Sequence, residues 1–335
     1  MIGTTQHPVS AEEAPRLTAA AVSRPQGRWA LETDSLTKRF GRKMALDSLT
    51  LRIARGGVHA LVGSNGAGKS TLFRLLLGLL RPTAGACSVL GTDCANLAPE
   101  VRGRIGLVHE EHTLPGWMSI ERLRLMHRDL YRCWNEKIYR EVLGHFNVLP
   151  EQQVRQLSRG ERAGVNLALA LALAQSPQLL MLDEPTLGLD VVAKQAFLEA
   201  LLFAGEDPGR TIVYCSHQMD EIERVAEDLV ILEGGRLVHH SPPDDFLQRI
   251  AAWTAIFPPG PLPVVPGLLQ TRRIEERTEL VVIDPDRDFP ALLASLGGDD
   301  IVRSSVGFDR AVNAFLTRGH SAPNSPDHPS PDSRK

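Results

Sequence analysis

Short apolar runs that end in glycine or polar residues recur through the first three quarters of the chain. They span residues 59–63, 179–182 and 211–215, and the second and third are followed by Asp183-Glu184 and Ser216-His217. An apolar, helix-like stretch at 69–80 follows the first run. Continuous apolar strands suit a sheet that is buried on both faces, with its chemistry at the strand ends. The pattern therefore predicts an α/β domain over residues 29–250.

The pattern changes after residue 250, where five prolines fall between positions 258 and 266. Strand-like stretches at 279–283 and 301–306 then alternate with helix-like stretches at 289–296 and 308–316, which predicts a small α+β domain over 251–319. Residues 1–28 lack periodicity and 320–335 are rich in Ser, Pro, Asp and His, so both ends are expected to be disordered.

The composition narrows the class of protein but does not identify its function. The chain has 335 residues, 43% hydrophobic and 23% charged, and a formal net charge of -3, which argues against a nucleic-acid partner. Its four cysteines have no zinc-site spacing, as expected for reduced thiols in a cytosolic protein. The longest apolar stretch, 165–174, is too short to span a bilayer, and we see no secretory signal. Any membrane role would be that of a peripheral subunit.

A glycine-rich phosphate-binding loop is the strongest chemical signal. Its residues are Gly63, Ser64, Asn65, Gly66, Ala67, Gly68, Lys69, Ser70 and Thr71, which match G-x-x-x-x-G-K-[ST]. The glycines let the backbone approach phosphate oxygens, and the following helix presents its positive end to them. Lys69 would bind the β- and γ-phosphates of ATP, and the Ser70 hydroxyl would bind Mg²⁺.

The acidic pair at the end of the second apolar strand supplies the remaining chemistry. Asp183 is expected to hold Mg²⁺ through water, and Glu184 to orient or deprotonate the attacking water. An Asp-Glu pair alone is usually a solvated strand end. Its value here comes from the apolar strand before it and the phosphate loop upstream.

An ordered set of motifs over residues 29–250 resembles the ATP-binding cassette (ABC) ATPases. Leu157-Ser158-Arg159-Gly160-Glu161 is similar to the family's signature, and Leu187-Gly188-Leu189-Asp190 is similar to its D-loop. His217 resembles the switch histidine that contacts the γ-phosphate, and Phe40 the aromatic residue that stacks on adenine. The resemblance implies the P-loop NTPase ABC cassette: a mixed-sheet core with a helical signature subdomain.

Three positions depart from the family's usual pattern. Glu110 stands where a metal-binding glutamine is usual; as a carboxylate it can still ligate Mg²⁺. Arg159 replaces a glycine of the signature, and Glu161 replaces a glutamine. We expect Arg159 to add a cation near the γ-phosphate bound by a partner chain.

The resemblance also implies partners and a location. Ser158 and Gly160 of one copy would cap the ATP held by another, so a second ABC ATPase chain, identical or related, is expected. A separate membrane permease would complete a transporter, with this subunit on the inner face of the cell membrane. The segment 110–126, with Trp117 and Met118, would touch that permease, or Trp117 would simply pack in the helical subdomain.

Two other functions stay open from sequence. The chain could be a soluble ABC ATPase acting on DNA or ribosomes, although such proteins usually carry a coiled-coil insertion or two cassettes. It could also be a regulatory module whose C-terminal domain binds a ligand. The exporter-type ATPase subunit is the reading that the motifs favour.

Overall fold

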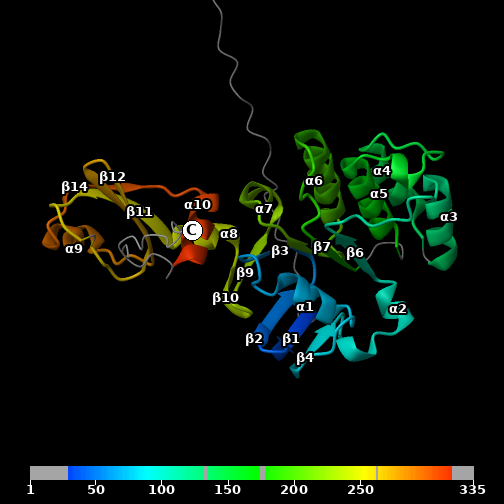
Figure 1. Ribbon diagram of the computed structural model, residues 1–335, viewed down its shortest axis with the longest axis horizontal. Helices are drawn as coiled ribbons and strands as arrows, with labels where there is room; N and C mark the ends of the chain where they lie inside the picture. The colour runs from blue at the N-terminus through cyan, green and yellow to red at the C-terminus, as the bar shows by residue number, and fades with distance from the viewer. Residues whose placement is uncertain (1–28, 132–133, 174–177, 262, 319–335) are drawn as a thin grey trace, which may run out of the picture.

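A mixed six-stranded sheet forms the centre of the molecule in the computed structural model, which describes residues 29–131, 134–173, 178–261 and 263–318 (Figure 1). The predicted end segments 1–28 and 320–335 lie outside these residues. The sheet order is β10-β9-β3-β8-β7-β6, parallel except for β10 against β9. Its strands are β3 (Gly57–Val62), β6 (Ile105–His109), β7 (Leu179–Asp183), β8 (Thr211–Cys215), β9 (Asp228–Glu233) and β10 (Arg236–Ser241).

An antiparallel sheet packs against the central sheet through helix α1 (Lys69–Leu76). Its strand order is β2-β1-β4-β5. These strands are β1 (Trp29–Phe40), β2 (Lys43–Ala54), β4 (Ala84–Val89) and β5 (Thr92–Asp93), and the short α2 (Pro99–Arg102) follows them. Apolar side chains of α1 and of both sheets share one core, which fixes the phosphate loop in front of α1.

A group of helices beyond β6 carries the signature segment (Figure 1). It consists of α3 (Ile120–Leu130), α4 (Glu136–Gly144) and α5 (Arg159–Ala172). Helix α5 is buried along most of its length, and Gly164 permits this because a Cβ there would lie 2.2 Å from the ring of Phe146. On the same side of the sheet lie α6 (Val191–Gly205) and α7 (Met219–Val225).

A third sheet, of order β12-β13-β11-β14, lies at the far end of the molecule from α3 (Figure 1). Its elements are β11 (Ile250–Ile256), β12 (Leu268–Ile274), β13 (Arg277–Ile283), α9 (Phe289–Ser295) and β14 (Asp299–Ser304), after α8 (Pro243–Gln248). Trp253, Phe289 and Leu293 lie in a small core of its own.

The last helix, α10 (Phe308–Thr317), joins the cassette's core instead. Phe315 meets the rings of Phe246 and His239 at 5.5 and 6.0 Å, and the helix packs on α7 and α8. The last helix of the C-terminal region therefore packs on α7, the helix that follows His217.

Some element bounds differ from those that the sequence pattern predicts, most clearly at one helix and at two strands. The helix expected over 69–80 ends at Leu76, where Gly78, with φ of +68°, begins a turn. Strands β11 and β12 flank the proline-rich stretch and were not predicted.

No helix within the described residues is long and apolar enough to cross a membrane.

Candidate nucleotide-binding site

The phosphate loop makes the tight turn that its glycines predict. Gly66 and Gly68 have φ of +85° and +102°, and a Cβ on Gly68 would lie 2.5 Å from the carbonyl oxygen of Ala45. Gly63 is as crowded, since a Cβ there would lie 2.4 Å from the Leu232 oxygen. At positions 63 and 68 a larger residue would displace β9 or β2, and at position 66 the positive φ alone favours glycine.

The lysine of this loop is held in place by backbone carbonyl oxygens of the loop itself. Lys69 is buried, and its Nζ donates to the carbonyl oxygens of Gly63 at 2.6 Å and Ser64 at 3.5 Å. Among the described residues no side chain caps the N-terminus of α1, so the first backbone N–H groups of this helix stay available to a ligand in the loop. A positive charge and free N–H groups on one concave turn are what a polyphosphate requires.

The acidic pair lies at the strand end beside this loop, as predicted. The Ser70 hydroxyl donates to Asp183 Oδ1 at 3.4 Å, which brings the two expected Mg²⁺ ligands together. Oxygen donors of this kind suit Mg²⁺. The strand register pairs Asp183, the last residue of β7, with His109 at the end of β6 and with Cys215 at the end of β8. The residues that follow these three strands therefore lie at the same edge of the sheet.

Glu184 and His217 contact each other directly. The Nδ1 atom of His217 lies 2.7 Å from Glu184 Oε2, and the His217 backbone N–H donates to the same oxygen at 3.3 Å. Glu184 is mostly buried, whereas half of the His217 side chain is exposed. A carboxylate with an adjacent exposed imidazole can orient a water molecule at the open side of the site.

The comparisons with known proteins agree with this geometry. Residues 46–187 match the family model described as ABC transporter. A Nod factor export ATP-binding protein I of Cupriavidus pinatubonensis is 35% identical over 285 residues, covering 82% of this chain and 85% of the relative. The chain belongs to the ATP-binding subunits of ABC transporters. The predicted family and cassette fold are confirmed, and the protein is an ATPase of that family.

Other relatives and solved structures support this ABC ATPase assignment. A daunorubicin resistance ATP-binding protein of Streptomyces coeruleorubidus is 36% identical over 224 residues, 64% of this chain and 69% of the relative. A solved ATP-binding subunit of an ABC transporter is 29% identical, with a TM-score of 0.58 over 65% of this chain and 92% of that one. A dimeric bacterial ABC transporter cassette, 23% identical with a TM-score of 0.56, shares the fold over 63% of this chain and 98% of its own.

The segment predicted to be the ABC signature, residues 157–161, forms a complete cap at the start of α5. The Ser158 hydroxyl accepts from the Glu161 N–H at 3.2 Å, and Glu161 Oε2 accepts from the Ser158 N–H at 2.7 Å. The glutamate at position 161 therefore keeps a capping box at the start of α5. Gly160 lies against α6, where a Cβ would meet Ala193 at 2.4 Å.

Arg159 turns toward its own chain. Its Nη2 donates to the Glu110 carbonyl oxygen at 3.4 Å, and a Cβ on Gly188 would lie 2.6 Å from its Nη1. The guanidinium thus lies between the predicted metal-binding loop at Glu110 and the predicted D-loop at Gly188. In the described chain Arg159 bridges two loops of its own cassette, a contact that the expected role toward a partner's phosphate did not include.

The remaining predicted positions lie at the margins of the site. Asp190 caps α6 by accepting from the Ala193 N–H at 2.8 Å. Phe40 is half exposed at the end of β1, with Lys38 Nζ 5.1 Å from its ring centre. Glu110 follows β6 and is partly exposed. The individual roles of all these residues stay predictions.

Two buried side chains near Glu184 were missed from sequence. Glu221, on α7, accepts from the Thr186 hydroxyl at 2.7 Å, from the Ser216 hydroxyl at 3.4 Å and from Tyr214. It thereby ties the loop after Glu184 to the loop before His217. Glu221 lies four positions before Val225, on the buried face of α7, and this spacing could have indicated from the sequence that Glu221 is buried.

The second residue missed from sequence is His112, which bonds to the Pro185 carbonyl oxygen at 2.9 Å.

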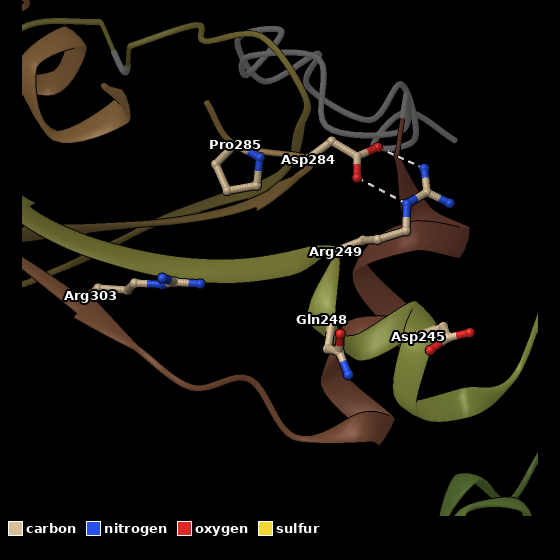
Figure 2. Close-up of a pocket in the computed structure, with 6 residues that line it drawn as sticks. All are labelled: Asp245, Gln248, Arg249, Asp284, Pro285 and Arg303. Carbon is tan, nitrogen blue, oxygen red and sulfur yellow. Dashed lines mark hydrogen bonds and ion pairs between the residues drawn. The ribbon is translucent and has the colours of Figure 1, made fainter. Parts of the chain in front are cut away.

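A hollow of about 580 Å³ in the C-terminal region is separate from the nucleotide site. Figure 2 shows its ion pair, in which Arg249 Nε and Nη2 donate to the Asp284 carboxylate at 2.9 and 2.6 Å. This pair lowers the pKa of Asp284 and raises that of Arg249. The Arg249–Asp284 ion pair links the start of β11 to the end of β13, so both residues have a structural role.

Proposed function

We propose that this chain hydrolyses ATP with Mg²⁺ to drive export through a separate membrane permease. The observation that carries the proposal is the convergence of Lys69, Asp183 and the Glu184–His217 pair on one edge of the sheet. A polyphosphate cradle, two oxygen ligands for a cation and a water-orienting carboxylate are the parts that phosphoryl transfer to water requires.

Each group has a distinct part in the proposed reaction. Lys69 and the loop N–H groups bind the β- and γ-phosphates, and Ser70 with Asp183 would hold Mg²⁺, which supplies neutralising charge. Glu184 orients the water and takes its proton, while His217 fixes that carboxylate through their 2.7 Å contact. The exposed His217 ring then reaches the γ-phosphate side of the pocket.

The site is completed by a second copy of this chain. Ser158 and Arg159 are exposed at the start of α5, although Leu157 and Gly160 beside them are buried. Val191 and Val192, directly after Asp190, are about four-fifths exposed, an unusual arrangement for consecutive valines. A dimer that covers these valines and sets Ser158 over the partner's loop explains both features.

Export is supported by the relatives, whose names refer to Nod factor export and daunorubicin resistance. Neither name concerns DNA or ribosomes, the alternative considered from sequence. Trp117, two-thirds exposed beside the partly buried Met118, offers an apolar contact for a permease. We therefore place the subunit in the cytoplasm, peripheral on the inner face of the membrane.

The catalytic part of the proposal is tested by Glu184→Gln. The amide cannot accept the proton of the attacking water, so steady-state ATP hydrolysis should fall at least 100-fold. The affinity for ATP should stay within about threefold, since Lys69 and the loop are unchanged. Phosphate release and equilibrium binding of a fluorescent ATP analogue measure the two quantities. Wild-type turnover in this variant would refute the assignment of Glu184.

A further inference from the structure

The backbone of Glu184 is held in an uncommon conformation. Its φ is +50°, in the left-handed region, and Pro185 follows it, which restricts its conformation further. Such a conformation persists only where surrounding contacts enforce it. Two of these contacts are the Glu184 N–H, which donates to the Cys215 carbonyl at 2.9 Å, and the carboxylate contact with His217.

A third contact comes from the segment after β6. His112 is 1% exposed, and its Nε2 lies 2.9 Å from the Pro185 carbonyl oxygen. A carbonyl can only accept, so Nε2 carries the hydrogen. The other ring nitrogen, Nδ1, is buried and has no hydrogen-bond partner among the described residues. Among the described residues the ring therefore makes a single directed hydrogen bond, to the carbonyl oxygen of Pro185, the residue after Glu184.

His112 is itself positioned by a tight turn. Its φ is +46°, and its N–H donates to the His109 carbonyl at 3.0 Å, which closes the turn over residues 109–112. The same turn includes Glu110, whose carbonyl oxygen accepts from Arg159. One turn thus contacts both the catalytic loop and the first residue of the signature helix.

From these contacts we infer that His112 is a positioning residue for hydrolysis, which fixes the Glu184 carboxylate by bonding the Pro185 carbonyl. The inference rests on the proposed role of Glu184. It makes the rate of the chemical step depend on the conformation of residues 109–112, which overlap the start of segment 110–126, the segment expected to touch a permease. The affinity for ATP does not depend on this bond, because neither His112 nor Pro185 belongs to the phosphate loop.

The test compares His112→Phe with His112→Gln in the full chain. Phenylalanine keeps the ring shape but cannot donate, whereas the glutamine Nε2 can take the place of the imidazole Nε2. We expect kcat to fall about tenfold in the Phe variant with the KM for ATP within twofold, as the loss of one such bond implies. The Gln variant should recover to within threefold of the wild type.

Two controls separate positioning from folding. His127 bonds the Leu123 carbonyl at 2.8 Å inside α3, so His127→Phe loses a similar bond away from Glu184 and should keep wild-type kcat. In the Glu184→Gln background, His112→Phe should cause no further loss of residual turnover, because its effect passes through that carboxylate. If the Phe variant does not melt cooperatively, His112→Leu replaces it with the same expectations.

Three results would overturn the inference: wild-type kcat in the Phe variant, equal losses in the Phe and Gln variants, or a tenfold loss that persists in the Glu184→Gln background. Wild-type turnover is measured first under the same conditions. Its absence would refute the proposed function itself, so the two failures are distinguishable.

Discussion

At the scale of single residues, the end of the sheet away from the nucleotide holds a charged cluster that affects stability. Asp228 Oδ2 contacts His59 Nδ1 at 3.0 Å and His240 Nε2 at 2.7 Å. Burial alone would raise the pKa of Asp228, but hydrogen bonds from both histidines outweigh it and hold that pKa well below its usual range. The bond to Asp228 in turn raises the pKa of His240.

The cluster predicts a pH-dependent stability. A histidine with a raised pKa stabilises the fold below its unfolded pKa of about 6.5, and this contribution is lost as the pH rises through the folded value. His240→Gln should therefore cost about 1 kcal/mol at pH 6 and progressively less above neutrality. Urea unfolding of both proteins across pH 6 to 9 measures the difference, which isolates His240 from His59 and from the neighbouring His239. A difference independent of pH would contradict the account.

Residues also show what sequence patterns could and could not predict. The phosphate loop and the Asp183-Glu184 pair are local, because their spacing along the chain sets their chemistry. The His112–Pro185 bond spans 73 positions and depends on how β6 and β7 align, so no local pattern contains it. Arg159 shows the same limit: its exposure was predictable, but its contact with Glu110 was not.

At the scale of elements, the missed strands have a physical explanation. Strand β11 reads Ile-Ala-Ala-Trp-Thr-Ala-Ile, which has neither clear alternation nor a helical stripe. Strand β12 has four polar residues among its seven, and in the part of the chain that the structure describes it pairs with β13 alone. Their placement is decided by β13, which lies between them, and such pairing is a tertiary effect.

Helix α10 makes a testable contribution to the stability of the cassette. Phe315 is 6% exposed against Phe246 and His239, so Phe315→Ala should lower the free energy of unfolding by about 3–5 kcal/mol. Asn313→Ala, on the exposed side of the same helix, should change it by less than about 0.5 kcal/mol. Urea unfolding followed by far-UV circular dichroism compares them. Equal stabilities of the two variants would show that α10 is not part of the cassette core.

At the scale of the whole molecule, no hydrogen bond recorded among the described residues joins the phosphate loop at 63–71 to the predicted signature at 157–161. The signature helix is capped and buried along its length, yet Ser158 is exposed at its start. In the proposed dimer, ATP lies between the loop of one copy and the signature of the other. Binding then closes the two copies together, and hydrolysis lets them separate.

Mixing two inactive variants tests this composite site most directly. Lys69→Ala disables the phosphate loop and keeps the signature, whereas Ser158→Arg keeps the loop and blocks the signature. Each alone should be inactive, but in an equal mixture half of the dimers regain one of two sites. The account predicts about a quarter of wild-type ATP hydrolysis on mixing. Activity no greater than the sum of the separate variants would contradict it.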